Sequence, residues 1–184
     1  MKKIILAVVG LPGAGKTEVV EYLMKKTSWP KVYFGQGTFD ELKRQGLPIN
    51  EGNEKKIREE LREKYGMAAM AVVNMSKVKE LFRQSSVIVE SLYSWEEYLE
   101  MKKEFGDAFK TLAIYSSPEI RIERLSTRLH RPLKMEEVIS RDYSQIEKLH
   151  QAGPISRADF TIINEGSIDD LFKNLDDLII KLSK

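Results

Sequence analysis

The sequence predicts an α/β fold in which a five-stranded, mostly parallel sheet lies between two layers of helices. Five short apolar runs recur along the 184 residues, and each is followed by a segment with helical periodicity. The first run leads directly into a glycine-rich turn. Strands that are apolar throughout, in alternation with helices, are typical of a parallel sheet covered on both faces.

The elements can be placed in chain order. The predicted strands cover residues 4–9, 32–34, 87–89, 112–115 and 160–163, and the predicted helices cover 17–26, 95–105, 119–129 and 168–182. No linker or internal repeat interrupts them. We therefore expect residues 1–184 to form a single domain.

The segment 38–83 differs from the rest because it is long, helical and without a strand. It is predicted to hold a short helix up to residue 45, a break, a charged helix over 53–65 and a more apolar helix over 67–82. We expect this segment to cover one edge of the sheet.

Composition narrows the function. The absence of cysteine excludes disulfide frameworks, thiolate metal sites and cysteine nucleophiles. With 30 Lys and Arg against 28 Asp and Glu, the net charge is +2, so nucleic acid is not an expected partner.

The apolar run at 4–9 is too short for a signal peptide, and no stretch approaches the ~20 apolar residues of a membrane span. We expect a cytoplasmic protein away from membranes, as a monomer or homodimer.

Residues 10–17 read GLPGAGKT and match G-x-x-x-x-G-K-[ST] between a predicted strand and a predicted helix. Glycines let backbone N–H groups converge on a phosphate, and the helix N-terminus adds a positive dipole. In such P-loops the lysine reaches the β- and γ-phosphates and the hydroxyl binds Mg²⁺. We predict a P-loop NTPase fold with ATP and Mg²⁺ as cofactors. The predicted nucleotide contacts here are Gly10, Leu11, Pro12, Gly13, Ala14, Gly15, Lys16 and Thr17.

P-loops also serve GTPases and motor ATPases. A small GTPase would show Asn-Lys-x-Asp, whereas residues 164–166 read Asn-Glu-Gly. AAA-type ATPases generally have longer chains. A compact kinase remains.

The chain resembles the nucleoside-monophosphate-kinase and dephospho-CoA-kinase group, and most of all a poorly characterised adenylate-kinase-related family. The resemblance rests on the GLPGAGKT loop, the helical insertion, an Arg-rich helix after the fourth strand, and AD-x-x-I-x-N-x-G-S at 158–167. It implies ATP-dependent phosphoryl transfer to a small acceptor bound by 38–83, a short lid at 124–141, and contact of Asn164 with adenine. The residues implied in catalysis are Lys16, Arg124, Arg128 and Arg141.

The helix predicted after the fourth strand carries arginines on one flank and apolar residues, among them Leu129, on the other. Guanidinium groups at this spacing suit a clamp on phosphate oxygens. Arg124 and Arg128 match the resembling family, and we assign Arg121 and Arg131 to the solvated edge.

Glu90 follows the predicted strand 87–89, at the sheet edge that would face the phosphate site. A carboxylate there can hold Mg²⁺ through its water shell, so we predict Thr17 and Glu90 as the metal contacts. The resemblance implies aspartate at this position. An ordinary carboxylate at a strand end is the alternative.

Four residues depart from adenylate kinases. Gln36 and Phe39 stand where those enzymes carry Asp and Arg, and Tyr93 and Ser94 stand where they carry an Arg. The loss of two guanidinium groups removes a bidentate grip on an acceptor phosphate. If all four line the acceptor pocket, it lacks fixed positive charge and AMP is a poor acceptor. Other sources of charge are Arg44, Arg58 and Arg62.

Two other functions stay open beside the kinase. A nucleotide-binding regulatory module with little transferase activity is favoured by the missing acceptor arginines. A weak NTPase acting with RNA is hinted at by Lys55-Lys56-Ile57-Arg58, although residues 53–64 hold three lysines and two arginines against four acids. The sequence does not identify the acceptor.

Overall fold

A computed structural model describes residues 2–129 and 131–182, and its strands form one sheet in the order β2-β3-β1-β4-β5. All four strand pairings are parallel, so the sheet is wholly parallel and the predicted α/β fold is confirmed. Strand β4 begins three residues before the prediction. The strands are β1 (Ile5–Val9), β2 (Lys31–Tyr33), β3 (Val87–Glu90), β4 (Phe109–Tyr115) and β5 (Phe160–Ile163).

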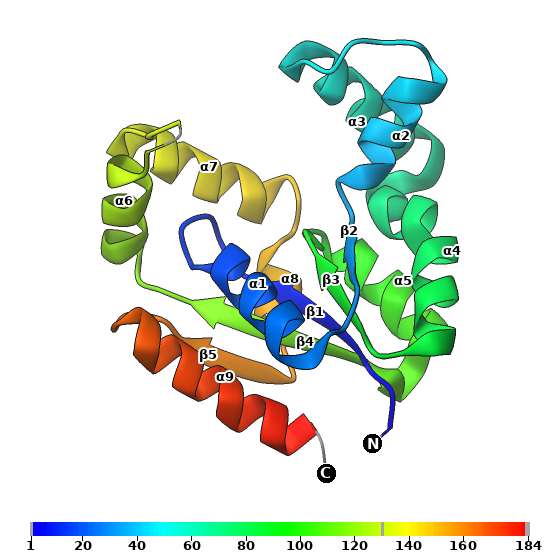
Figure 1. Cartoon of the computed structure of the whole chain (residues 1–184). Helices are drawn as coiled ribbons and strands as arrows, with labels where there is room; N and C mark the ends of the chain where they lie inside the picture. The colour runs from blue at the N-terminus through cyan, green and yellow to red at the C-terminus, as the bar shows by residue number, and fades with distance from the viewer. Residues whose placement is uncertain (1, 130, 183–184) are drawn as a thin grey trace.

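Helices cover both faces of the sheet (Figure 1). Helices α1 (Lys16–Thr27) and α9 (Ile168–Leu182) pack on one face, where their leucines join Leu6 and Val8 of β1 in one core. Helices α4 (Ala69–Gln84) and α5 (Trp95–Phe105) pack on the other face with the alternate β1 residues. Because β1 is buried on both faces, all its residues are apolar.

An arm of two helices projects beyond the sheet between β2 and β3 (Figure 1). It comprises α2 (Gln36–Arg44) and α3 (Glu51–Tyr65), and the short turn η1 (Gly66–Ala68) joins α3 to α4. Helix α3 starts two residues before the prediction because the Asn50 side chain accepts a hydrogen bond from the N–H of Asn53 at 2.9 Å.

The region between β4 and β5 differs from the prediction. Helix α6 (Pro118–Thr127) ends two residues early, and Arg128 is extended at φ −63° and ψ 145°. Arg131 has φ 52° and precedes Pro132, a position that disfavours helix. The expected arginine flank is therefore wrong beyond Thr127, and Leu129 is 95% exposed. Two helices that we did not predict follow, α7 (Met135–Glu147) and α8 (Ala152–Ser156).

Residue 130, within the predicted lid, lies outside the described residues. None of the described helices is long and apolar enough to cross a membrane. The cytoplasmic location stays a prediction.

Glu97 is a buried carboxylate at the start of α5 that makes stability depend on pH. It accepts hydrogen bonds from the N–H groups of Tyr93 (2.7 Å) and Ser94 (3.1 Å) in a capping box. Burial raises the pKa of Glu97 to about 7, against the opposing effect of those bonds and of Arg62. Because the folded state holds this proton more tightly than the unfolded chain, the stabilisation is present at low pH and is lost as pH rises through 7.

We expect Glu97→Gln to flatten this dependence. The amide oxygen can still accept the two hydrogen bonds, but no proton is lost on going from pH 5 to pH 8. The free energy of unfolding of the variant, relative to wild type, should therefore rise over this interval. Urea unfolding at both pH values measures it, with the more exposed Glu100→Gln as the control. An equal pH dependence in wild type and Glu97→Gln would contradict the prediction.

Candidate functional site

The turn between β1 and α1 has the backbone of a phosphate-binding loop. Gly10, Gly13 and Gly15 have φ values of 148°, 80° and 94°, a region that favours glycine. A Cβ at Gly15 would collide with the side-chain amide of Asn164. A Cβ at Gly13 would lie 2.9 Å from the carbonyl oxygen of Arg121. Close packing on the outer side of the loop therefore requires glycine at these positions.

Side chains from other elements hold the loop carbonyls. A trans peptide directs its N–H away from its C=O, so carbonyls bonded outward leave N–H groups directed toward the opposite, inner side. The N–H groups that follow the bonded carbonyls belong to Leu11, Gly13 and Gly15. An anion is the ligand that such converging donors attract. The bonds run from Gln151 Nε2 to Gly10 O (3.0 Å), from Arg121 Nη1 to Pro12 O (3.2 Å) and from Asn164 Nδ2 to Ala14 O (2.9 Å).

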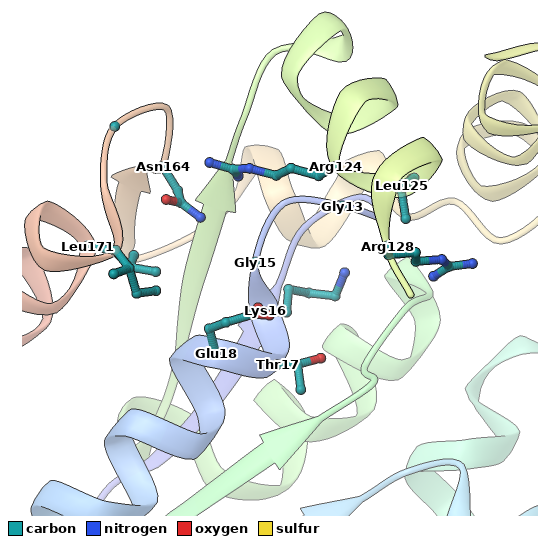
Figure 2. A pocket seen from close by; sticks show the side chains of 12 residues that line it. Gly13, Gly15, Lys16, Thr17, Glu18, Arg124, Leu125, Arg128, Asn164 and Leu171 are labelled. Carbon is teal, nitrogen blue, oxygen red and sulfur yellow. The ribbon is translucent and has the colours of Figure 1, made fainter. Parts of the chain in front are cut away.

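A cavity of about 440 Å³, here called the loop cavity, opens beside the loop, a size within the range of small-ligand sites. Figure 2 shows side chains from the loop and α1, from α6 and from the start of α9 around it. Cationic groups exceed acidic ones in its lining, with Glu18 as the acid. The predicted site residues that line it are Gly13, Gly15, Lys16, Thr17, Arg124, Arg128 and Asn164.

Lys16 is the cation that the loop at residues 10–17 itself carries. Its Nζ donates to the carbonyl oxygen of Leu11 at 3.1 Å. Burial, and next the charge of Arg121, lowers the pKa of Lys16 to about 8, while Glu90 and Glu18 oppose the shift. A bound phosphate would place a negative charge beside Lys16 and would therefore favour the protonated form of its side chain.

The other arginines have different surroundings. Arg124 Nη1 donates to the Ser116 hydroxyl at 3.1 Å, and Figure 2 shows its side chain reaching toward Asn164. Arg128 Nε donates to the carbonyl oxygen of Arg131 at 2.7 Å. Arg141 is exposed on α7 and is not among the described residues that line the cavity. Its catalytic role stays a prediction.

Arg121 contradicts its assignment to the solvated edge. The residue is 3% exposed and forms an ion pair with Asp142 at 2.6 Å. Helical spacing predicted the face of α6 on which Arg121 lies. It did not predict that α7 packs against this face. Its bond to Pro12, like the bond of Gln151 to Gly10, has no local sequence signal, because the partners are 109 and 141 residues apart.

Glu90 lies at the end of β3, beside Val8 of β1. Its carboxylate pairs with Lys31 Nζ at 2.7 Å, and among the described residues it does not line the loop cavity. Its charge nevertheless acts on Lys16. A hydroxyl at Thr17 and a carboxylate at Glu90 are the hard oxygen donors that Mg²⁺ prefers, so these residues fit the ion.

A second cavity of about 650 Å³, here called the arm cleft, lies between the arm and α7. Phe39 and Tyr93 line it, whereas Gln36 bonds Asp40 and the buried Ser94 caps α5. The condition under which the pocket would lack fixed positive charge is therefore not met, and Arg58 and Arg62, two of the other suggested sources of charge, line the cleft. Four cations and two acids line it, namely Lys55, Arg58, Arg62 and Lys148 with Glu54 and Glu59.

The charges of the arm cleft are only partly paired. Arg58 lies 3.3 Å from Glu54, and Lys55 lies 3.9 Å from Glu59. Arg62 and Lys148 make no ion pair with any residue in the described part of the chain. Arg44, the third suggested source of charge, pairs with Glu41 and lies outside the lining.

Comparison with known proteins places the chain in a family. Residues 6–149 match a family model described as AAA domain. The chain is 33% identical to the UPF0200 protein PF1294 of Pyrococcus furiosus, over 95% of both chains. The chain belongs to the UPF0200 family. A UPF0200/UPF0201 protein of Archaeoglobus fulgidus is 33% identical over 98% of this UPF0200 chain, which spans 56% of that protein.

Solved structures with a similar fold include several described as kinases. A shikimate kinase from Bacteroides thetaiotaomicron has a TM-score of 0.60 at 15% identity, over 96% of this UPF0200 chain and 98% of the other. A gluconokinase from Sinorhizobium meliloti has a TM-score of 0.59 at 14% identity, over 99% and 98%. These likenesses show a P-loop kinase-like fold. The exclusion of AAA-type families on the ground of chain length was therefore not valid, because residues 6–149 match a family model described as AAA domain.

Proposed function

We propose that the protein is an ATP-binding, Mg²⁺-dependent phosphotransferase that moves the γ-phosphoryl group of ATP to a small acceptor. The observation that carries the proposal is the loop whose carbonyls are bonded outward, so that its N–H groups are left for phosphate. The arm cleft, a second and cationic cavity in the same domain, could hold an acceptor. It therefore supports phosphoryl transfer over nucleotide binding alone.

Each residue has a separate proposed role. The loop N–H groups and Lys16 hold the phosphates, and Arg124 and Arg128 neutralise charge on the transferring group. Asn164 keeps the loop in shape and borders the nucleotide. Thr17 and Glu90 would hold Mg²⁺, which supplies charge neutralisation of the phosphates when bound with ATP.

The metal role of Glu90 predicts a specific defect. Glu90→Gln should raise the Mg²⁺ concentration needed for half-maximal activity by about tenfold and the ATP requirement by much less, because one charged oxygen is lost from the ion's surroundings. Titration of Mg²⁺ and of ATP separately measures both. Glu18→Gln, which removes a carboxylate that lines the loop cavity, is the control. An unchanged Mg²⁺ requirement in Glu90→Gln would contradict the metal role and leave the residue its ion pair with Lys31 and its effect on the charge of Lys16.

The lining of the arm cleft supports an anionic acceptor, contrary to the expectation from Gln36, Phe39, Tyr93 and Ser94. Arg62 is half-buried, and its side chain lines the cleft without an ion pair to a described residue. It is therefore available to an anion.

The test is ADP release from ATP and Mg²⁺ with a panel of nucleoside monophosphates, dephospho-CoA and uncharged alcohols. We expect anionic members to raise ADP release. Arg62→Ala should remove this rise and leave ATP affinity unchanged, and Arg44→Ala, outside the cleft, should not. A preference for uncharged alcohols would contradict the acceptor assignment. ATP binding with no transfer to any member would favour the regulatory module.

A further inference from the structure

The Arg121 side chain joins three parts of the molecule. Nε donates to the carbonyl oxygen of Ser116 at 3.1 Å, at the end of β4. Nη1 donates to Pro12 O at 3.2 Å, in the phosphate-binding loop. Nη1 and Nη2 donate to the two carboxylate oxygens of Asp142 at 2.8 and 2.6 Å, on α7. The guanidinium therefore fixes α7 against the loop in a directional, bidentate geometry.

Helix α7 also borders the arm cleft. Asp142 faces Arg121, while Ser144 near the end of α7, together with Lys148 and Leu149 just after it, lines the cleft. Helix α7 thus contacts Arg121, which holds the phosphate-binding loop, and also lines the arm cleft, although none of its described residues lines the loop cavity. Figure 1 shows α7 lying between the loop side of the sheet and the arm.

The pair is sensitive to small displacements because both partners are shielded from water. The Arg121 side chain is 4% exposed and that of Asp142 is 16% exposed. Separating such charges leaves an uncompensated ion in a poorly solvated place. If α7 moved away, the Arg121 side chain could keep its ion pair with Asp142 or its hydrogen bond to Pro12 O, but not both. Loss of the bond to Pro12 would free the peptide that directs the N–H of Gly13 inward.

We propose that Arg121 is a positioning residue of the phosphate-binding loop, and that its pair with Asp142 couples the loop to α7. Phosphate binding and the position of α7 then depend on each other. This inference needs a loop that binds phosphate but no transfer to an acceptor. A failed transfer assay would therefore leave it standing.

The first test uses the free protein. Asp142→Asn should raise the hydrogen-exchange rate of protected loop amides, such as that of Ala14, whose N–H donates to Leu11 O at 3.2 Å, by about tenfold, as expected for weakening a charge-assisted hydrogen bond. Glu147→Gln removes the same charge from the exposed end of α7 and should leave these amides unchanged. If the loop amides of Asp142→Asn exchanged at the wild-type rate, the proposed coupling would be wrong.

The second test adds ATP with Mg²⁺, or pyrophosphate with Mg²⁺. Either should slow exchange over residues 135–147 in wild type, although these residues lie outside the loop cavity. In the double variant Arg121→Gln/Asp142→Asn, which removes both charges and avoids leaving one unpaired, this protection of α7 should disappear. Protection of α7 that persists in the double variant would overturn the proposal.

Discussion

Replacing Lys16 by alanine should lower phosphoryl transfer by at least about 10³-fold and weaken ATP binding, because the variant loses the cation of the phosphate-binding loop. Its Nζ bonds only a carbonyl of its own loop among the described residues, Leu11 O at 3.1 Å. Burial already penalises its charge, as the pKa of about 8 indicates. We therefore expect the fold to survive the substitution.

Calorimetry of ATP binding and a transfer assay measure the two losses, and circular dichroism checks the fold. Lys25→Ala is a matched control, because Lys25 is exposed on the same helix and does not line the loop cavity. Equal ATP affinity and equal transfer in Lys16→Ala and wild type, with unchanged circular dichroism, would contradict the assignment of the loop.

The second large effect concerns Arg124 and Arg128. Each single alanine variant should lower kcat by about 10²-fold, and the double variant by about 10³- to 10⁵-fold, since guanidinium groups stabilise charge that develops during transfer. ATP affinity should fall much less. Arg124 comes from α6, and Arg128 follows the end of that helix, so the two reach the loop cavity from different backbone geometries.

Single-turnover rates and ATP affinity, measured separately, distinguish transition-state stabilisation from binding. Arg157→Ala, which removes an exposed arginine after α8, is the control. If the double variant lost ATP affinity and kept its single-turnover rate, these arginines would serve binding alone.

Local patterns predicted the parts of the fold that depend on neighbouring residues. The strands, the loop at residues 10–17 and the helices at 95–105 and 168–182 follow from runs and spacing within a few positions. The sequence did not predict where α6 ends, because that depends on the turn before Pro132. Helix α7, which begins inside the predicted lid at 124–141, and helix α8, which lies beyond it, were both missed.

Contacts between residues that are distant in the chain could not be predicted from the sequence for a different reason. Gln151 and Arg121 hold the loop through partners more than a hundred positions away, and only packing brings them together. The charge of the arm cleft depends on how α3 faces α7, and the sequence did not show that Gln36 and Ser94 lie outside its lining. Asn164 was recognised, but its bond to Ala14 was not.

The destination of the γ-phosphoryl group of ATP tests the proposed function most directly. Labelled ATP and Mg²⁺ are incubated with the protein and the acceptor panel, and the products are separated. We predict that the label appears in an anionic acceptor, that ADP forms in equal amount, and that Lys16→Ala abolishes both. Label found only in inorganic phosphate, or left in ATP at full ATP occupancy, would contradict a phosphotransferase.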